Sequence, residues 1–311
     1  MGALPGQMIR PIEKKAVVSM INQRESGRQK SSSLKWLTHV ALISFCLLAV
    51  TPIAWMVSTS LKTADNSILF PPQILPKPMV PRNYLEVIRG DNTRFLLWAR
   101  NTMIVAVLTV AGTTLSSAIV AYGFAKIQFR GRGVLFVIML STMMIPFPVT
   151  MVPLFTIFRR LGDLTGMAWL GTFKPLWVPA WFGSAFSIFL LRQFFLTIPK
   201  DLSEAARIDG CGELGILFRV VLPLARPALA VVALFSFMVV WNDFLAPLVY
   251  LQRPEQFTLA LGLDNFQSAV GGTPWHLLMA ASVLVILPVV ALFFLAQRTF
   301  IEGITTTGIK G

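Results

Sequence analysis

The amino-acid sequence predicts an all-α polytopic membrane protein with six transmembrane helices. Of its 311 residues, 55% are apolar and 13% are charged, whereas charged residues form about a quarter of a soluble domain. A chain so poor in charge cannot cover its surface against water, so lipid must surround most of it. Six apolar runs reach the length of about 20 residues that a helix needs to cross the hydrocarbon core. Because these runs lack two-residue alternation, helices are favoured over a barrel.

The expected chain consists of a basic tail, residues 1–35, and one transmembrane domain, residues 36–311. The first apolar run is longer than the apolar region of a signal peptide, about 7 to 15 residues, and no small-x-small cleavage site follows it, so we expect a retained anchor. Prolines interrupt the first, third and sixth runs, where a missing backbone donor favours a kink. The expected spans cover residues 36–57, 102–125, 133–158, 176–195, 228–250 and 277–300.

The distribution of Lys and Arg predicts which segments face the cytoplasm. If the N-terminus is cytoplasmic, the inner segments hold 17 basic residues and the outer segments hold 10, which agrees with the excess of basic residues in cytoplasmic loops. With six spans, the C-terminus is then cytoplasmic too. The long outer loop ends in Phe95, Leu96, Trp98 and Ala99, for which we expect a short interfacial helix anchored by the tryptophan.

Composition and spacing exclude several functions. The net charge of +13 does not indicate a nucleic-acid partner, because the basic residues lie between apolar runs and form no single patch. Cys46 and Cys211 are expected to be free thiols, and His39 and His276 lie too far apart to suggest a metal site. The sequence has no Gly-Lys dipeptide and hence no P-loop. We therefore expect no metal, no cofactor and no enzymatic activity on this chain.

A charged helical hairpin, residues 199–227, separates the fourth expected span from the fifth. Pro199 precedes a short helix for which Asp201 or Ser203 is available as an N-terminal cap, and Gly210 and Gly212 are expected to end it. Such a hairpin either lies on the bilayer surface or docks into a groove of a cytoplasmic partner, and the residue pattern favours neither.

The second helix of the hairpin has an apolar stripe. Leu214, Leu217, Phe218 and Val221 recur at helical spacing, so we expect them to share one face. Pro223 then turns the chain back towards the membrane.

The hairpin also carries a family motif. Glu204-Ala205-Ala206 is followed after three residues by Gly210 and, nine residues later, by VVLP at 220–223. This pattern resembles the EAA motif of the permease subunits of ABC importers, with Val220 in place of the usual isoleucine. Four further stretches resemble the carbohydrate-uptake branch, in particular the MalG-like subunits of maltose-type importers: FAKIQFRGR at 124–132, IFLLRQFFLTIPKDLSEAARIDG at 188–210, WNDFLAPLVYL at 241–251 and TTGIKG at 306–311.

The resemblance covers about residues 36–311 and implies the MetI-like permease fold of type I ABC importers. It implies that the first short helix is a coupling helix, seated in a cleft of an ATP-binding subunit. For two of its charged residues, Arg207 and Asp209, plain solvation explains the charge equally well. The implied docking residues are Glu204, Ala205, Ala206, Arg207, Asp209 and Gly210. The residues implied to pack the second helix against the transmembrane bundle are Leu214, Leu217, Phe218 and Pro223.

The same resemblance implies the partners and the mechanism. The chain would pair with a homologous second permease subunit in the bacterial cytoplasmic (inner) membrane and would bind two ATP-binding subunits, which carry the ATP and Mg. An extracytoplasmic sugar-binding protein would deliver a sugar, oligosaccharide or polyol. Closure of the ATP-binding subunits would draw the coupling helices together and open the permeases outward, and hydrolysis would reset them inward.

The stretch WNDF places one acidic residue inside an expected span. Counted from Pro227, Asp243 would lie about 24 Å along the helix, near the outer end of a core of about 30 Å. Two interpretations remain open. Asp243 is an interface residue or a helix contact, or Trp241, Asn242 and Asp243 line the substrate pathway, with the ring packed on a sugar and the polar groups bonded to its hydroxyls.

Three other functions explain part of the sequence. An ABC importer for a polyamine or a phosphate ester would share the hairpin, although the matches at 188–210 and 241–251 favour sugar. An ion-driven secondary transporter would show paired interrupted helices and several buried ionisable residues, of which this sequence offers only Asp243. A membrane receptor or scaffold explains six spans but not the hairpin.

Overall fold

The computed structural model describes residues 11–90, 94–267 and 272–305, with side chains at 35–90, 94–267 and 272–297. The final TTGIKG and the first ten residues lie outside this part of the chain. Every regular element in the described residues is a helix, which confirms the predicted all-α class. The chain divides into two compact units, Met1–Val57 and Ser58–Gly311.

The described part of the first unit is the helix α1, Pro11–Ser60, whose last residues belong to the second unit. Its part Lys35–Ser60 is long and apolar enough to cross a membrane, with a mean hydropathy of 2.3. The helix continues through Pro52, as membrane helices can when the freed carbonyl finds another partner. Its first described residue, Pro11, lies inside the expected basic tail.

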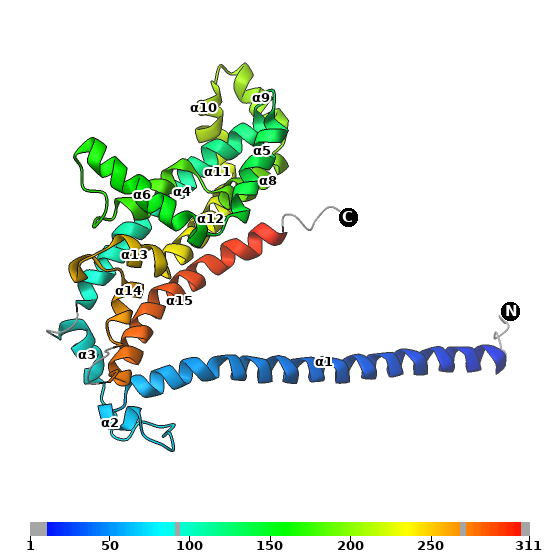
Figure 1. The fold of residues 1–311 in the computed structure, drawn as a ribbon. Coiled ribbons are helices and arrows are strands. Elements are labelled where there is room, and N and C mark those ends of the chain that lie inside the picture. The colour runs from blue at the N-terminus through cyan, green and yellow to red at the C-terminus, as the bar shows by residue number, and fades with distance from the viewer. Residues whose placement is uncertain (1–10, 91–93, 268–271, 306–311) are drawn as a thin grey trace, which may run out of the picture. The chain divides into compact units, whose positions relative to one another are not determined.

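The second unit is organised around the long helix α4, Phe95–Lys126. The helices α8 (Ala185–Thr197) and α12 (Arg226–Trp241) pack along α4, and α12 packs in turn on α15 (Trp275–Thr305), as Figure 1 shows. In the same view, α9 and α10 lie at one end of this unit and α3 lies at the other.

The remaining elements are the 19-residue helix α6, shorter helices and single turns. They are α2 (Ala64–Ser67), α3 (Arg82–Arg89), α5 (Arg132–Ser141), η1 (Thr142–Met144), α6 (Phe147–Thr165), α7 (Lys174–Trp177), η2 (Val178–Phe182), α9 (Lys200–Ile208), α10 (Glu213–Ile216), η3 (Leu217–Val221), α11 (Leu222–Leu224), α13 (Leu245–Tyr250), η4 (Pro254–Gln256) and α14 (Leu259–Asp264).

The candidate membrane spans number four in the described residues, or up to six if each of two bent pairs is one span. The third expected span, 133–158, is bent by 99° between Met144 and Phe147, where Pro146 breaks the helix. The fifth, 228–250, is helical only to Trp241; residues 245–250 form the separate helix α13. At the other end of α12, a bend of 82° between Leu224 and Arg226 separates this helix from the hairpin.

The prediction of a short interfacial helix at residues 95–99 was wrong. These residues are the first turns of α4, and the side chain of Trp98 is buried. Its indole N–H donates to the carbonyl oxygen of Pro254 over 2.8 Å. A buried indole needs such a partner, so the tryptophan fastens the loop after α13 to α4 instead of anchoring in headgroups.

Two hydrophobic clusters hold the second unit together, and α4 contributes to both. We call them the elbow core and the distal core. From Trp98 in the distal core to Tyr122 in the elbow core, α4 spans about 36 Å. The elbow core comprises Ala118, Ala121, Tyr122, Ala125, Ile188, Leu191, Phe195, Ile198, Ala206, Ile216, Leu217, Val221, Ala225, Ala228 and Val232. The distal core comprises Val87, Phe95, Trp98, Trp241, Leu259, Phe266, Leu278, Ala280 and Ala281.

Candidate functional site: the elbow at residues 199–224

The elbow, residues 199–224, contains α9, α10, η3 and α11. Its first arm, α9, begins at Lys200 directly after Pro199, with no side-chain cap. The expected cap by Asp201 or Ser203 was therefore wrong: Asp201 lies in the first turn, where its charge favours the positive end of the helix.

Helix α9 turns one face to the elbow core and leaves the rest exposed. Ala206 is buried in that core, so it packs inside this chain. The sequence analysis had placed it on the docking surface instead. The helix also ends in an apolar side chain that the sequence analysis did not single out, Ile208, which is 86% exposed. The other expected docking residues are exposed: Glu204, Ala205, Arg207, Asp209 and Gly210.

Gly210 makes the turn between the two arms. Its φ of +85° lies in the left-handed region, which glycine adopts without the strain that a Cβ would cause. The backbone N–H of Gly210 donates to Arg207 O over 3.1 Å, and that of Cys211 donates to Ala206 O over 2.9 Å. These bonds satisfy carbonyls at the end of α9 and define the direction in which the second arm leaves.

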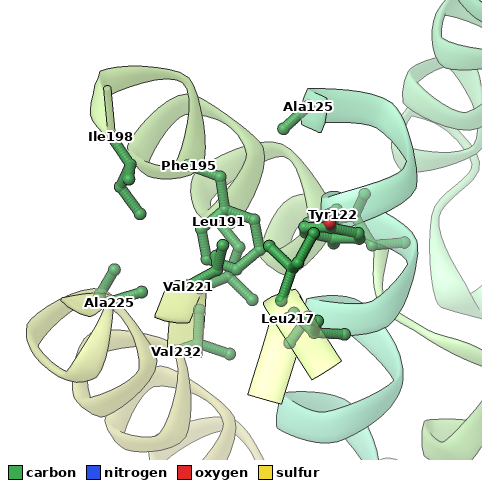
Figure 2. Packing of buried hydrophobic residues seen from close by; sticks show 14 of the residues in the cluster. Tyr122, Ala125, Leu191, Phe195, Ile198, Leu217, Val221, Ala225 and Val232 are labelled. Carbon is green, nitrogen blue, oxygen red and sulfur yellow. The ribbon is translucent and has the colours of Figure 1, made fainter. Parts of the chain in front are cut away.

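The second arm packs through a different set of side chains from the expected stripe. Ile216, Leu217 and Val221 are fully buried, and Figure 2 shows Leu217 and Val221 beside Leu191 and Phe195 of α8 and Tyr122 of α4. Leu217 is thus a packing residue as expected. The same expectation was wrong for the remaining three residues, because Leu214, Phe218 and Pro223 are exposed.

The physical reason is the helix type. Residues Leu217–Val221 form a π-helical turn, which places an extra residue in the turn and shifts the faces away from the 3.6-residue period. Phe218, which lies in this turn, is 51% exposed, and Leu214, which precedes it, is 66% exposed. With Ile208, Leu202 and Leu224, they give the elbow five exposed large apolar side chains. Exposed apolar surface of this kind marks contact with a partner or with lipid.

One carboxylate joins the two arms to α4. Oε1 of Glu213 accepts a hydrogen bond from Nη2 of Arg207 over 2.6 Å, and Oε2 accepts one from the phenol O–H of Tyr122 over 2.6 Å. Arg207 and Glu213 are about half exposed, whereas Tyr122 is buried. Hydrogen bonding to the Glu213 carboxylate raises the pKa of Arg207 above its already high value, so the guanidinium stays charged.

Basic side chains tie the nearby helix ends together. Nζ of Lys126 donates to the carbonyl of Ile198 over 2.7 Å, and Nε of Arg192 donates to that of Phe124 over 3.2 Å. The Arg192 guanidinium also lies 4.2 Å from the ring centroid of Phe136, a cation–π contact. Carbonyls at helix C-termini lack intrahelical donors, so these bonds connect the end of α4 to α8 and its C-cap, Ile198, which directly precedes the elbow.

The expected pathway residues have separate surroundings. Trp241 is buried in the distal core, where its indole N–H donates to Val285 O over 3.1 Å, so of the two interpretations left open the helix contact fits this residue. Asn242 is exposed, and its side chain donates to Met238 O. Oδ1 of Asp243 accepts a hydrogen bond from the backbone N–H of Ala246 over 3.2 Å, at the start of α13.

A cavity of about 600 Å³ lies between α4, α8 and α12. Its size falls in the range of pockets for small molecules, about 300 to 1,000 Å³. Hydroxyl-bearing residues and two phenyl rings, those of Phe186 and Phe235, contribute to its walls. The lining residues are Thr109, Thr113, Ser184, Phe186, Ser187, Phe235, Ser236, Met238, Val239 and Val240.

The described residues contain no group of three or more His, Cys, Asp or Glu side chains that could hold a metal ion. Both cysteines are free, as the sequence analysis predicted. The site consists of an exposed helix, a glycine turn and a carboxylate that contacts a long helix. A polytopic helical membrane subunit with such an elbow at one end is the class that this fold and site define.

The chain belongs to the family of binding-protein-dependent transport system inner membrane components, the membrane-embedded permease subunits of ABC importers. The family model matches residues 112–305, which include the whole elbow. This confirms the family resemblance that the EAA motif indicated.

Several similar proteins are named as permeases of sugar transport systems. The arabinooligosaccharides transport system permease of Bacillus subtilis is 36% identical over 269 residues, 85% of this chain and 92% of that protein. The trehalose/maltose transport system permease of Thermococcus litoralis is 31% identical over 274 residues, 88% of this chain and 95% of that protein.

Solved structures show the same fold. A bacterial ABC transporter involved in the import of the acidic polysaccharide alginate contains a chain that matches with a TM-score of 0.73 at 26% identity, over 84% of this chain and 94% of that chain. A chain from the alginate transporter in complex with an alginate pentasaccharide-bound periplasmic protein matches with a TM-score of 0.63 at 13% identity, over 86% and 95%.

Proposed function

We propose that this chain is the transmembrane permease subunit of an ABC importer that moves a sugar, oligosaccharide or polyol into the cytoplasm. The observation that carries this function is the exposed α9 with the EAA motif, on a chain whose relatives are named as oligosaccharide transport permeases. ATP hydrolysis on two partner subunits drives the transport, since this chain has no P-loop.

The exposed residues of α9 and its following turn form the docking surface for an ATP-binding subunit. Ala205 permits close approach, Arg207 and Asp209 offer polar contacts, and Ile208 provides an apolar anchor. Because the docking partner is cytoplasmic, the elbow, the N-terminus and the C-terminus face the cytoplasm, and the distal core faces outward. A second permease subunit completes the pathway, and an extracytoplasmic sugar-binding protein delivers the substrate.

The cavity between α4, α8 and α12 is where this subunit contributes to the substrate pathway. Hydroxyls of Thr113 and Ser187 can exchange hydrogen bonds with a sugar, and the phenyl rings can pack on its C–H face. Of the three residues that the sequence analysis considered for the pathway, Asn242 is exposed, although it does not line this cavity. Such contacts suit a pathway, because weak binding lets the cargo leave.

The test is uptake by the reconstituted transporter. The chain is co-expressed with candidate ATPase, permease and binding-protein partners, purified as a complex and placed in proteoliposomes. Labelled arabinooligosaccharides, maltose and a polyol are compared with spermidine and glycerol 3-phosphate. We expect ATP-dependent, binding-protein-dependent uptake of a saccharide or polyol. Uptake of only spermidine or glycerol 3-phosphate, or uptake driven by an ion gradient without ATP, would contradict the proposal.

A further inference from the structure

We propose that Glu213 is a positioning residue that transmits movement of the docking helix α9 to the long helix α4. This inference rests on the proposed function, in which α9 is seated on an ATP-binding subunit. It begins from the two oxygens of one carboxylate: Arg207 of α9 bonds to Oε1, and Tyr122 of α4 bonds to Oε2. A side chain of the moving helix and a side chain of the receiving helix thus share one acceptor.

The first half of this connection braces the elbow. Arg207 precedes the glycine turn and Glu213 follows it, so their ion pair, with a second bond from Nε over 3.3 Å, spans the turn. Gly210 itself has open space around it, with no heavy atom within 4 Å of a Cβ placed there. Packing at the glycine therefore does not hold the two arms together, and the ion pair opposes bending of the turn.

The second half reaches into the membrane bundle. Tyr122 is 3% exposed and lies in the elbow core, and Figure 2 shows its ring among Leu191, Phe195 and Leu217. Its hydroxyl donates to an ionised acceptor, and charge-assisted hydrogen bonds of this length are stronger than neutral ones. A displacement of α9 therefore acts on α4 through a short polar contact as well as through apolar packing.

The position of Tyr122 makes this contact useful over distance. It lies one turn before the end of α4, whose opposite end carries Trp98 in the distal core. The same helix lines the cavity through Thr109 and Thr113. Because a helix is stiff along its axis, a shift applied at Tyr122 moves the cavity wall and the distal contacts together.

The experiment uses the complete transporter and the variants Tyr122→Phe, Glu213→Gln and their combination. Tyr122→Phe removes one hydroxyl and keeps the buried ring, so the core stays packed. Three quantities are measured: the ATPase retained on purification, the thermal midpoint, and the number of sugars imported per ATP hydrolysed. The matched controls are Tyr84→Phe, which removes a hydrogen bond to Ser60, and Glu255→Gln, which removes an ion pair with Arg94.

We expect both single variants to retain the ATPase and the thermal midpoint, while the import per ATP falls by about fivefold or more, the lower range of allosteric coupling. The double variant should fall no further, since both changes break one connection. The controls should behave as wild type. Normal import per ATP in Tyr122→Phe and Glu213→Gln would overturn the inference.

Loss of the ATPase in Tyr122→Phe would overturn it as well, because the carboxylate would then shape the docking surface and not transmit its movement. A wild-type chain that retains no ATP-binding subunit would instead overturn the proposed function. The two failures are therefore distinguishable.

Discussion

Gly262 of α14 lies against the indole ring of Trp98, and a methyl group has no space between them: a Cβ at Gly262 would overlap Cε3 and Cδ2 of that ring. We expect Gly262→Ala to destabilise the protein by about 1–3 kcal/mol, as overpacking does. Thermal unfolding of the purified protein measures this. Gly123→Ala is the control, because no atom lies within 4 Å of its Cβ position; equal midpoints for the two variants would contradict the contact.

The neighbouring alanines of the EAA motif should behave differently. Ala205 is exposed and Ala206 is buried in the elbow core. We expect Ala206→Leu to lower stability by about 1–3 kcal/mol through overpacking, and Ala205→Leu to leave the thermal midpoint unchanged but to release the ATPase during purification. If Ala205→Leu keeps a full complement of ATPase and transports normally, Ala205 does not face the partner.

The turn at Gly210 predicts a backbone effect. Its φ of +85° costs about 1–2 kcal/mol for a residue with a Cβ. We expect Gly210→Ala to destabilise the elbow, measured as faster proteolysis between the two arms and reduced ATPase retention. Gly212→Ala, at a φ of −72° with open space around it, serves as the control. Identical digestion patterns for the two variants would show that the turn tolerates a side chain.

The buried indole of Trp241 predicts a stability effect without a substrate effect. Trp241→Phe removes the hydrogen bond from the indole N–H to the partly buried carbonyl of Val285 and shrinks a buried side chain. The loss of one such hydrogen bond costs about 0.5–1.5 kcal/mol. We expect a lower thermal midpoint with an unchanged KM for uptake. A raised KM at unchanged stability would return Trp241 to the substrate pathway.

Much of the fold could be predicted from the sequence. The apolar runs exceed the length of a buried soluble helix, and this fixes the class, because only a membrane accommodates them. The EAA pattern located the elbow and its glycine turn. The bends at Pro146 and near Arg226 could not be derived, since proline permits a kink without setting its angle.

The faces of the elbow were harder to predict. A period of 3.6 residues assigned Leu214 and Phe218 to the interior, but both are exposed, and Phe218 lies in the π-helical turn at 217–221. The local residue pattern does not predict the π-helical turn. The link between Glu213 and Tyr122 joins residues 91 positions apart, and one sequence gives no signal for such a pair, although an alignment with co-varying positions would.

Site-specific cross-linking at residue 205 tests the central claim most directly. In a background in which Cys46 and Cys211 are replaced, Ala205→Cys places one thiol on the exposed face of α9. The account predicts that membrane-impermeant maleimide does not label this thiol in intact cells, labels it in inside-out vesicles, and that a short bifunctional reagent joins it to the ATP-binding subunit. Labelling in intact cells, with no cross-link to that subunit, would contradict the account.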